Sequence, residues 1–171
     1  MTTIAYNNGL MASDTQITAG STRERIESKI FQQHGLTIGV AGTLAVLNRM
    51  MINGIPKPKK KQSFDSYVLN ELLPYARVMK KDAHGGESEG DWDHDSQLLV
   101  ASSDRVAVVG LADGSVVSGC ADEYFSIGSG APFALAAMYL HQSADEAVRV
   151  AMQFDIGTGG NVVSLATNEI K

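Results

Sequence analysis

The residues best suited to chemistry stand at the beginning of the chain. Removal of Met1 would leave Thr2 as the first residue, with a free α-amine beside its hydroxyl. A threonine hydroxyl is a weak nucleophile at neutral pH, but an α-amine with a pKa of about 8 is able to accept its proton. One residue would then supply both the nucleophile and the base.

Two charged residues farther along, Asp14 and Lys29, are able to tune such a pair. An ammonium close to the hydroxyl lowers the free-energy cost of the negative charge that develops on the oxygen. A carboxylate beside that ammonium keeps it charged and oriented, because an unpaired charge in a partly buried site is costly. Taken singly, Asp14 is also typical of a turn, and Lys29 of a solvated surface.

Three further segments give this set a context. Residues 40–45 read Val-Ala-Gly-Thr-Leu-Ala, residues 127–134 contain Gly-Ser-Gly, and residues 154–162 contain Asp-Ile-Gly-Thr-Gly-Gly. Each segment is a weak signal alone. Their order and spacing behind a Thr-Thr-Ile opening, Asp14 and Lys29 resemble the proteasome β-type and HslV-like subunits, a branch of the N-terminal-nucleophile hydrolases. The resemblance covers nearly the whole chain.

The resemblance implies a threonine peptidase and gives each motif a role. Thr2 is the expected nucleophile, Lys29 its electrostatic support, and Asp14 the partner of Lys29. The main-chain N–H of Gly42 is expected to donate to the oxyanion of the reaction. The catalytic set is completed by three residues that would surround the α-amine: Ser129, Asp155 and Thr158.

The same resemblance implies a substrate cleft and an ion site. An extended peptide would lie as an added strand beside residues 16–18 and Gly42. The substrate-binding residues are expected to be Ile17, Thr18, Glu27, Phe31, Val40 and Leu44. The chemistry itself requires no cofactor, but main-chain oxygens of Met152, Asp155 and Thr158 would suit a structural Na⁺ or Mg²⁺.

Hydrophobic patterning predicts an α+β fold, and the resemblance implies a four-layer αββα sandwich. A tight turn at residues 7–9 is expected to join the first two strands. Pro74 should kink or restart the helix that Ser63 caps, and Ser143 with Glu146 predicts a capping box. The expected strands are 2–5, 10–14, 36–41, 97–101, 105–111, 115–120 and 162–166, and the remaining helices 43–53, 132–140 and 144–153.

Composition agrees with one soluble domain over residues 1–171. The chain has 44% hydrophobic residues and a net charge of −5, which allow a real core and argue against nucleic acid as a partner. It shows neither an apolar run of membrane-spanning length nor a signal sequence, and its single cysteine suits a reducing compartment. A cytoplasmic protein without membrane contact is therefore expected.

Two sets of reactive side chains are given structural roles instead. Cys120 is expected to be a small core residue rather than a nucleophile, because no histidine accompanies it. The polar, glycine-rich stretch 82–95 is expected to be a mobile loop. Its metal-binding residue types lack a rigid spacing and are interpreted as surface residues: His84, Asp91, Asp93 and His94.

The expected assembly is a homo-oligomeric ring that acts on polypeptides, and the sequence leaves open whether an AAA+ unfoldase serves it. Two other functions stay open as well. A retained Met1 would acylate the amine of Thr2 and leave a catalytically silent assembly protein of the same fold. The other is an N-terminal-nucleophile amidase on small amides, which a small open oligomer would favour, whereas a stacked ring would favour the peptidase.

Overall fold

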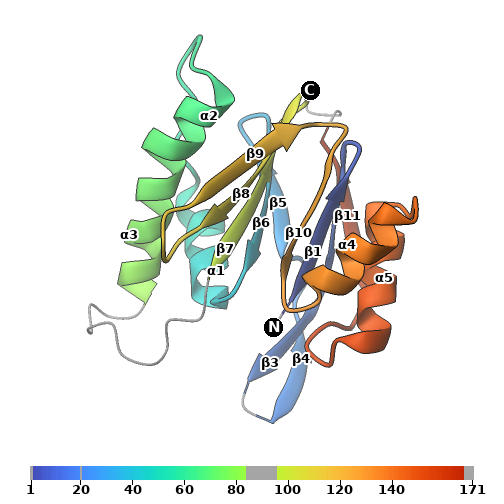
Figure 1. Cartoon of the computed structure of the whole chain (residues 1–171). Helices are drawn as coiled ribbons and strands as arrows, with labels where there is room; N and C mark the ends of the chain where they lie inside the picture. Colours follow the sequence, from blue (N-terminus) through green and yellow to red (C-terminus); the bar gives the residue numbers. More distant parts are fainter. Residues whose placement is uncertain (1, 20, 84–95, 168–171) are drawn as a thin grey trace.

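The computed structural model describes residues 2–19, 21–83 and 96–167, in which two β-sheets pack face to face with helices on both outer faces (Figure 1). The elements in chain order are β1 (Thr3–Asn7), β2 (Leu10–Asp14), β3 (Gln16–Ala19), β4 (Thr22–Arg25), β5 (Ile30–Gln33), β6 (Leu36–Ala41), α1 (Leu44–Asn53), α2 (Phe64–Tyr67), the π-helical turn η1 (Val68–Leu72), α3 (Leu73–Ala83), β7 (Gln97–Ala101), β8 (Arg105–Gly110), β9 (Val116–Cys120), β10 (Tyr124–Gly128), α4 (Ala131–Tyr139), α5 (Ala144–Phe154) and β11 (Val162–Ala166).

The first sheet is antiparallel, with the strand order β10-β1-β2-β11. Asn7 pairs with Leu10 across a two-residue turn. The φ angles of Asn8 and Gly9 are 47° and 80°, as a type I′ hairpin turn requires at both central positions. The tight first hairpin predicted from the sequence is confirmed.

The second sheet is antiparallel in the order β5-β6-β7-β8-β9, and β3 pairs with β4 in a separate hairpin. Strand β7 shows why this sheet lies inside the molecule. Leu98 and Val100 point into one core, whereas Leu99 and Ala101 point into another. A strand buried on both faces reads as a continuous apolar run, so alternation cannot reveal it.

Three hydrophobic cores separate four layers. One core lies between the five-stranded sheet and the layer of α1, α2, η1 and α3. A second fills the space between the sheets, with Ile4 and Tyr6 facing Leu99 and Val106. The third lies between the four-stranded sheet and helices α4 and α5. The predicted α+β, four-layer αββα sandwich is therefore confirmed.

Helix boundaries follow their local chemistry. Helix α1 ends where Gly54 takes a φ of 75°. Ser63 Oγ caps α2 by accepting the N–H three residues ahead at 3.3 Å. The helix restarts as α3 next to Pro74, after the π-helical turn η1. The capping box predicted at α5 is present, with Glu146 accepting the N–H of Ser143 at 3.0 Å.

Several short elements escaped prediction. Strands β3, β4, β5 and β10 have four or five residues each, and all four residues of β4 are exposed, so no apolar alternation marks it. The predicted core position of Cys120 was wrong, because this residue is exposed at the end of β9, an edge strand. Most of the loop predicted over 82–95, with its histidines and acidic residues, lies outside the described residues.

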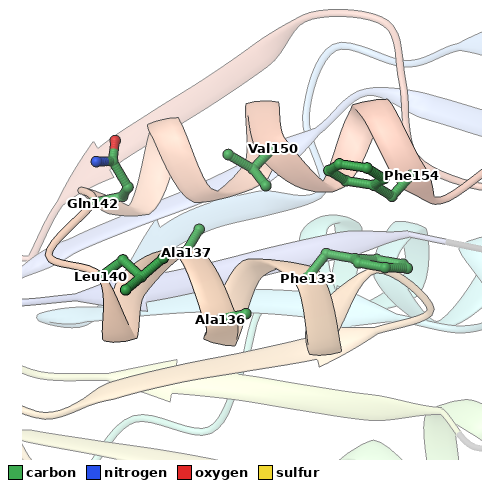
Figure 2. Close-up of a pocket in the computed structure, with 7 residues that line it drawn as sticks. All are labelled: Phe133, Ala136, Ala137, Leu140, Gln142, Val150 and Phe154. Atoms are coloured by element: carbon green, nitrogen blue, oxygen red, sulfur yellow. The ribbon is translucent and has the colours of Figure 1, made fainter.

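The outer layer of α4 and α5 carries an apolar groove of about 380 Å³ (Figure 2). The rings of Phe133 and Phe154 stack across it with centroids 5.5 Å apart. Its lining comes from both helices and the turn between them: Phe133, Ala136, Ala137, Leu140, Gln142, Val150 and Phe154. No helix of residues 2–19, 21–83 and 96–167 has the length and apolar character that crossing a bilayer requires.

Candidate active site

The predicted catalytic residues meet at one end of the four-stranded sheet. Thr2 stands directly before β1, the strand between β10 and β2. Asp14 is the last residue of β2, and Ser129 follows β10. The antiparallel register brings the start of β1 next to the ends of β2 and β10, since Thr3 pairs with Gly128 and Ile4 pairs with Ser13.

Asp14 and Lys29 form a buried ion pair, called here the inner pair. Lys29 Nζ lies 2.8 Å from Asp14 Oδ1, and the two side chains are 3% and 0% exposed. The carboxylate also accepts three main-chain N–H groups, from Thr3 at 2.9 Å, Gln16 at 3.2 Å and Gly159 at 3.1 Å. Burying a charge requires such complete pairing.

Burial lowers the pKa of Lys29, because a dry environment disfavours the ammonium. The charges of Asp14 and Asp155 and the hydrogen bond to Asp14 oppose this effect. The charged form of Lys29 is thus less stable in this site than it would be in water. Such a group suits the stabilisation of negative charge that develops beside it.

Ser129, Asp155 and Thr158 form a second polar group, called here the outer triad. Asp155 Oδ2 accepts hydrogen bonds from Ser129 Oγ at 2.7 Å and Thr158 Oγ1 at 2.5 Å. Burial acts to raise the pKa of Asp155, but the bonds from Thr158, Ser129 and Gly157 outweigh it, so the pKa lies below its ordinary value. Asp155 is therefore ionised at neutral pH.

The outer triad reaches the beginning of the chain through Ser129. Because the Ser129 hydroxyl gives its proton to Asp155, its oxygen is free to accept. The main-chain nitrogen of Thr2 donates to that oxygen at 3.3 Å. The nitrogen of Thr2 thus donates to Ser129 Oγ, which in turn donates to the Asp155 carboxylate. This arrangement stabilises positive charge on the nitrogen.

Gly42 lies close to the same end of the sheet. It follows β6, is exposed, and has a φ of 111°, which favours glycine. Its neighbour Ala41 is near Thr2, because a β-carbon placed on Gly128 would lie 3.5 Å from Ala41 Cβ and 2.1 Å from the Thr2 carbonyl oxygen. The structure thus brings Ala41, the residue before Gly42, near Thr2, and donation of the Gly42 N–H to an oxyanion stays a prediction.

The predicted substrate residues fall into two groups. Ile17 and Thr18 lie on β3, half-buried and exposed respectively, and Glu27 is exposed. The other three residues contact the core beneath α1, where Val40 is only 4% exposed: Phe31, Val40 and Leu44. The first group offers more surface to a ligand than the second does.

Comparisons with known proteins bear on the fold. No family model matches the chain, and no curated protein does. Among solved structures it is similar to Thiobacillus denitrificans BPH, with a TM-score of 0.68 and 20% identity over 96% of this chain and 95% of that one. It is also similar to Anbu, the ancestral β-subunit from Yersinia bercovieri, with a TM-score of 0.65 and 17% identity over 96% of this chain and 80% of that one. For the eukaryotic HslV from Trypanosoma brucei the TM-score is 0.55 and the identity 18%, over 96% of this chain and 98% of that one.

The fold is that of the proteasome-like N-terminal-nucleophile hydrolases. This part of the resemblance noted from the sequence is confirmed. At 17–20% identity the likeness carries fold alone, so catalysis by Thr2 and HslV-like properties stay predictions.

The predicted ion site lies at the end of α5 in this proteasome-like fold. Met152 is in the last turn of that helix, where carbonyl groups lack intrahelical partners. The carbonyl of Asp155 already accepts the N–H of Thr158 at 3.0 Å. Within the described residues no cluster of three or more His, Cys, Asp or Glu side chains is arranged for a metal. A cation here would depend on main-chain oxygens, and it stays a prediction.

Two residues that contact the site, Thr3 and Gly159, were not predicted, and Gln16 was expected only beside the substrate peptide. Gln16 donates through Nε2 to the carbonyl of Ile156 at 3.1 Å. Gly159 accepts the N–H groups of Thr15 and Gln16 at 3.2 and 3.0 Å, besides donating to Asp14. Thr3 contacts both the inner pair and the outer triad. The sequence signals were the residues beside recognised motifs, in Thr-Thr-Ile, Asp-Thr-Gln and Thr-Gly-Gly.

Proposed function

We propose that this chain is a threonine-type endopeptidase subunit whose nucleophile is Thr2 after removal of Met1. The observation that carries the proposal is the position of the chain's beginning between two polar groups. The nitrogen of Thr2 donates to Ser129 of the outer triad, and the nitrogen of Thr3 donates to Asp14 of the inner pair. Convergence of a buried ion pair and a partly exposed, hydrogen-bonded carboxylate on one chain end is typical of a reactive centre.

In the proposed acylation step the α-amine of Thr2 takes the proton of its own hydroxyl. Thr2 Oγ then forms a bond to the carbonyl carbon of the peptide, and the π electron pair moves to the carbonyl oxygen. When the tetrahedral intermediate collapses, the carbon–nitrogen bond breaks. The leaving nitrogen receives the proton that the α-amine held, and an ester on Thr2 remains.

Lys29 and Gly42 would act on the negative charges of this step. Lys29 stabilises the Thr2 oxygen as it loses its proton, and Asp14 fixes the lysine in place. The N–H of Gly42 would donate to the oxyanion. Removal of one such donor commonly costs about 10²–10³-fold in rate.

The outer triad would act on the positive charge. The α-amine becomes an ammonium during attack, and the ionised Asp155 stabilises it through Ser129. In deacylation the amine takes a proton from water, and the resulting hydroxide attacks the ester carbonyl. Cleavage of the ester returns the proton to Thr2 Oγ and releases the second product.

The substrate would be an extended polypeptide added along β3. Among the described residues β3 has β4 as its only strand partner, which leaves an edge for a peptide. Most of the predicted substrate residues are apolar and favour an apolar side chain before the cut. Glu27 is exposed and would instead select a basic one if it turns toward the cleft.

A homo-oligomeric ring would keep this cleft away from other proteins. Both outer helix layers support contacts between copies of the chain. The groove of α4 and α5 is open and apolar (Figure 2), and Phe154 and Leu140 beside it are 66% and 68% exposed. The opposite layer, formed by the helices between residues 43 and 83, exposes Ile52 by 82% and Leu69 by 51%. Native mass spectrometry tests the ring, and a stable monomer fully active on peptides would contradict it.

The nucleophile is tested with an inhibitor and a pair of variants. The similar Thiobacillus denitrificans BPH has been solved in complex with epoxomicin. We expect epoxomicin to block hydrolysis of a fluorogenic peptide by this chain and to bind it, and both effects to disappear in Thr2→Ala. Cys120→Ala serves as the matched control and should keep both, because Cys120 is exposed on an edge strand. Loss of turnover in the cysteine variant alone would contradict the proposal.

A further inference from the structure

Thr3 is tied to both halves of the site. Its main-chain N–H donates to Asp14 Oδ1 at 2.9 Å, and its Oγ1 lies 2.6 Å from Oγ1 of Thr158. The residue is completely buried, so neither solvent nor substrate reaches its side chain. Thr3 therefore contacts the inner pair through its backbone and the outer triad through its hydroxyl.

The hydrogen bond between Thr3 and Thr158 has a defined direction. Asp155 is ionised and has no proton to give, so Thr158 must donate its only hydroxyl proton to Asp155. The oxygen of Thr158 is then the acceptor, and the hydroxyl of Thr3 is the donor. A hydroxyl that accepts one hydrogen bond donates a stronger one. Thr3 thus strengthens the bond that holds Asp155.

Neighbouring glycines leave the space that this contact needs. A β-carbon on Gly130 would lie 2.0 Å from Thr3 Oγ1 and 2.9 Å from Thr158 Oγ1. The φ of Gly130 is −86°, which any residue adopts, so glycine is required for space and not for backbone conformation. The turn between β10 and α4 is therefore shaped around the side chain of Thr3.

We infer that the hydroxyl of Thr3 is a positioning group, which holds the outer triad in place relative to the α-amine of Thr2. It acts through Thr158 and touches neither the substrate nor the reacting atoms. The inference rests on the function proposed for Thr2. Valine has the shape of threonine without the hydroxyl, so it separates the hydrogen bond from the packing.

The test compares Thr3→Val with the unchanged chain, both processed to begin at Thr2. We expect kcat on a fluorogenic peptide to fall about fivefold to tenfold, the usual effect of one lost hydrogen bond. KM should not change, because Thr3 is buried. The acid limb of the pH profile reports the α-amine of Thr2, the proposed base, and should move to lower pH, because a displaced outer triad stabilises the ammonium less. Thr3→Ser, which keeps the donor, should recover most of the lost rate.

Thr37→Val is the matched control. Thr37 is a completely buried threonine on β6 whose hydroxyl accepts from Gln32 Nε2 at 3.1 Å, and we expect no change in kcat or in the pH profile. NMR titration of the Asp155 carboxyl adds a readout that needs no catalysis, and the pKa should rise in Thr3→Val.

The outcomes separate the two hypotheses. An inactive processed chain whose Asp155 pKa rises in Thr3→Val would overturn the function proposed for Thr2 and support the positioning contact. An unchanged Asp155 pKa in Thr3→Val would overturn the positioning role of Thr3, whether or not the chain hydrolyses peptides. A fall in kcat that Thr3→Ser does not relieve would assign the effect to packing and would also overturn that role.

Discussion

The inner pair and the outer triad are both polar, yet they differ in burial and in how their charges are balanced. Asp14 and Lys29 are almost inaccessible, and the lysine balances the carboxylate with a full opposite charge. Asp155 is only partly buried and is held by hydroxyl and amide donors without a cation in direct contact among the described residues. The charges of the inner pair therefore contribute to the stability of the fold. The outer triad, which is partly exposed, responds instead to the protonation state of the Thr2 nitrogen.

This difference predicts where mutations will act. A substitution that removes one member of the inner pair leaves the other charge buried and unpaired, and so affects both stability and rate. A change in the outer triad exposes a group that water is able to solvate, so it affects rate and pH dependence more than folding.

The largest effect is expected for Lys29→Met. It leaves the Asp14 carboxylate completely buried without its cation, which commonly costs about 3–5 kcal/mol. Urea unfolding should show this loss, and peptide hydrolysis should be abolished. The double variant Asp14→Asn/Lys29→Met removes both charges and should recover much of the stability, but not the activity. A cost below about 1 kcal/mol in the single variant would contradict a charge-coupled inner pair.

A smaller and differently placed effect is expected for Asp155→Asn. The change removes the negative charge that would stabilise the ammonium of Thr2, so kcat should fall about 100-fold. Stability at neutral pH should change by about 1 kcal/mol or less, because Asp155 is partly exposed and its partners are neutral. Equal losses of stability in Asp155→Asn and Lys29→Met would remove the distinction between the two groups.

The outer triad should also affect how the stability of the fold depends on pH in the acid range. The pKa of Asp155 in the folded chain lies below its ordinary value, so the folded state binds a proton less readily than the unfolded state does. Its contribution is complete above the unfolded carboxyl pKa of about 3.9 and is lost as pH falls through the lower folded value. Stability curves below about pH 4 should therefore be flatter in Asp155→Asn. Curves of equal slope would contradict the stabilising role of its hydrogen bonds.

The smallest effect is expected for Ser13→Ala, next to Asp14. The hydroxyl of Ser13 is completely buried and has no hydrogen-bond partner among the described residues. Its register partners Ile4 and Val163 contribute to the core between the sheets. Removal should leave stability unchanged or raise it by about 1 kcal/mol, because an unsatisfied hydroxyl is lost. A clear loss in thermal unfolding would reveal a partner for this hydroxyl.

The fold was predictable wherever local chemistry was strong. The turn at Asn8 and Gly9, the strand over residues 36–41 and the capping box at Ser143 all agree with the structure. Strand β10 was not predicted, since it pairs with β1, far away in the chain. Strands β3 and β4 form a local hairpin, but β4 is exposed throughout and shows no apolar alternation. The exposure of Cys120 was missed for a similar reason, because edge position is a property of the sheet.

The candidate site was predictable as a set of motifs but not as a network. The charges of Asp14 and Lys29 behind an N-terminal threonine pointed to these two residues, and the resemblance implied Asp155. The structure places all three with their hydrogen-bond donors near the start of the chain. Gly130 and Thr3 were missed, because the need for a missing β-carbon or a buried hydroxyl arises only when the segments pack.

The measurement that tests Thr2 most directly compares two forms of the same chain on a fluorogenic peptide. One form begins at Thr2, released by cleavage of an N-terminal fusion, and the other retains Met1, with both ends verified by intact mass. A free α-amine is the proposed base, so only the first form should hydrolyse the peptide, and chain produced without a fusion should be found without Met1. Equal activity of the two forms, or full activity of Thr2→Ala in the first form, would contradict catalysis by Thr2.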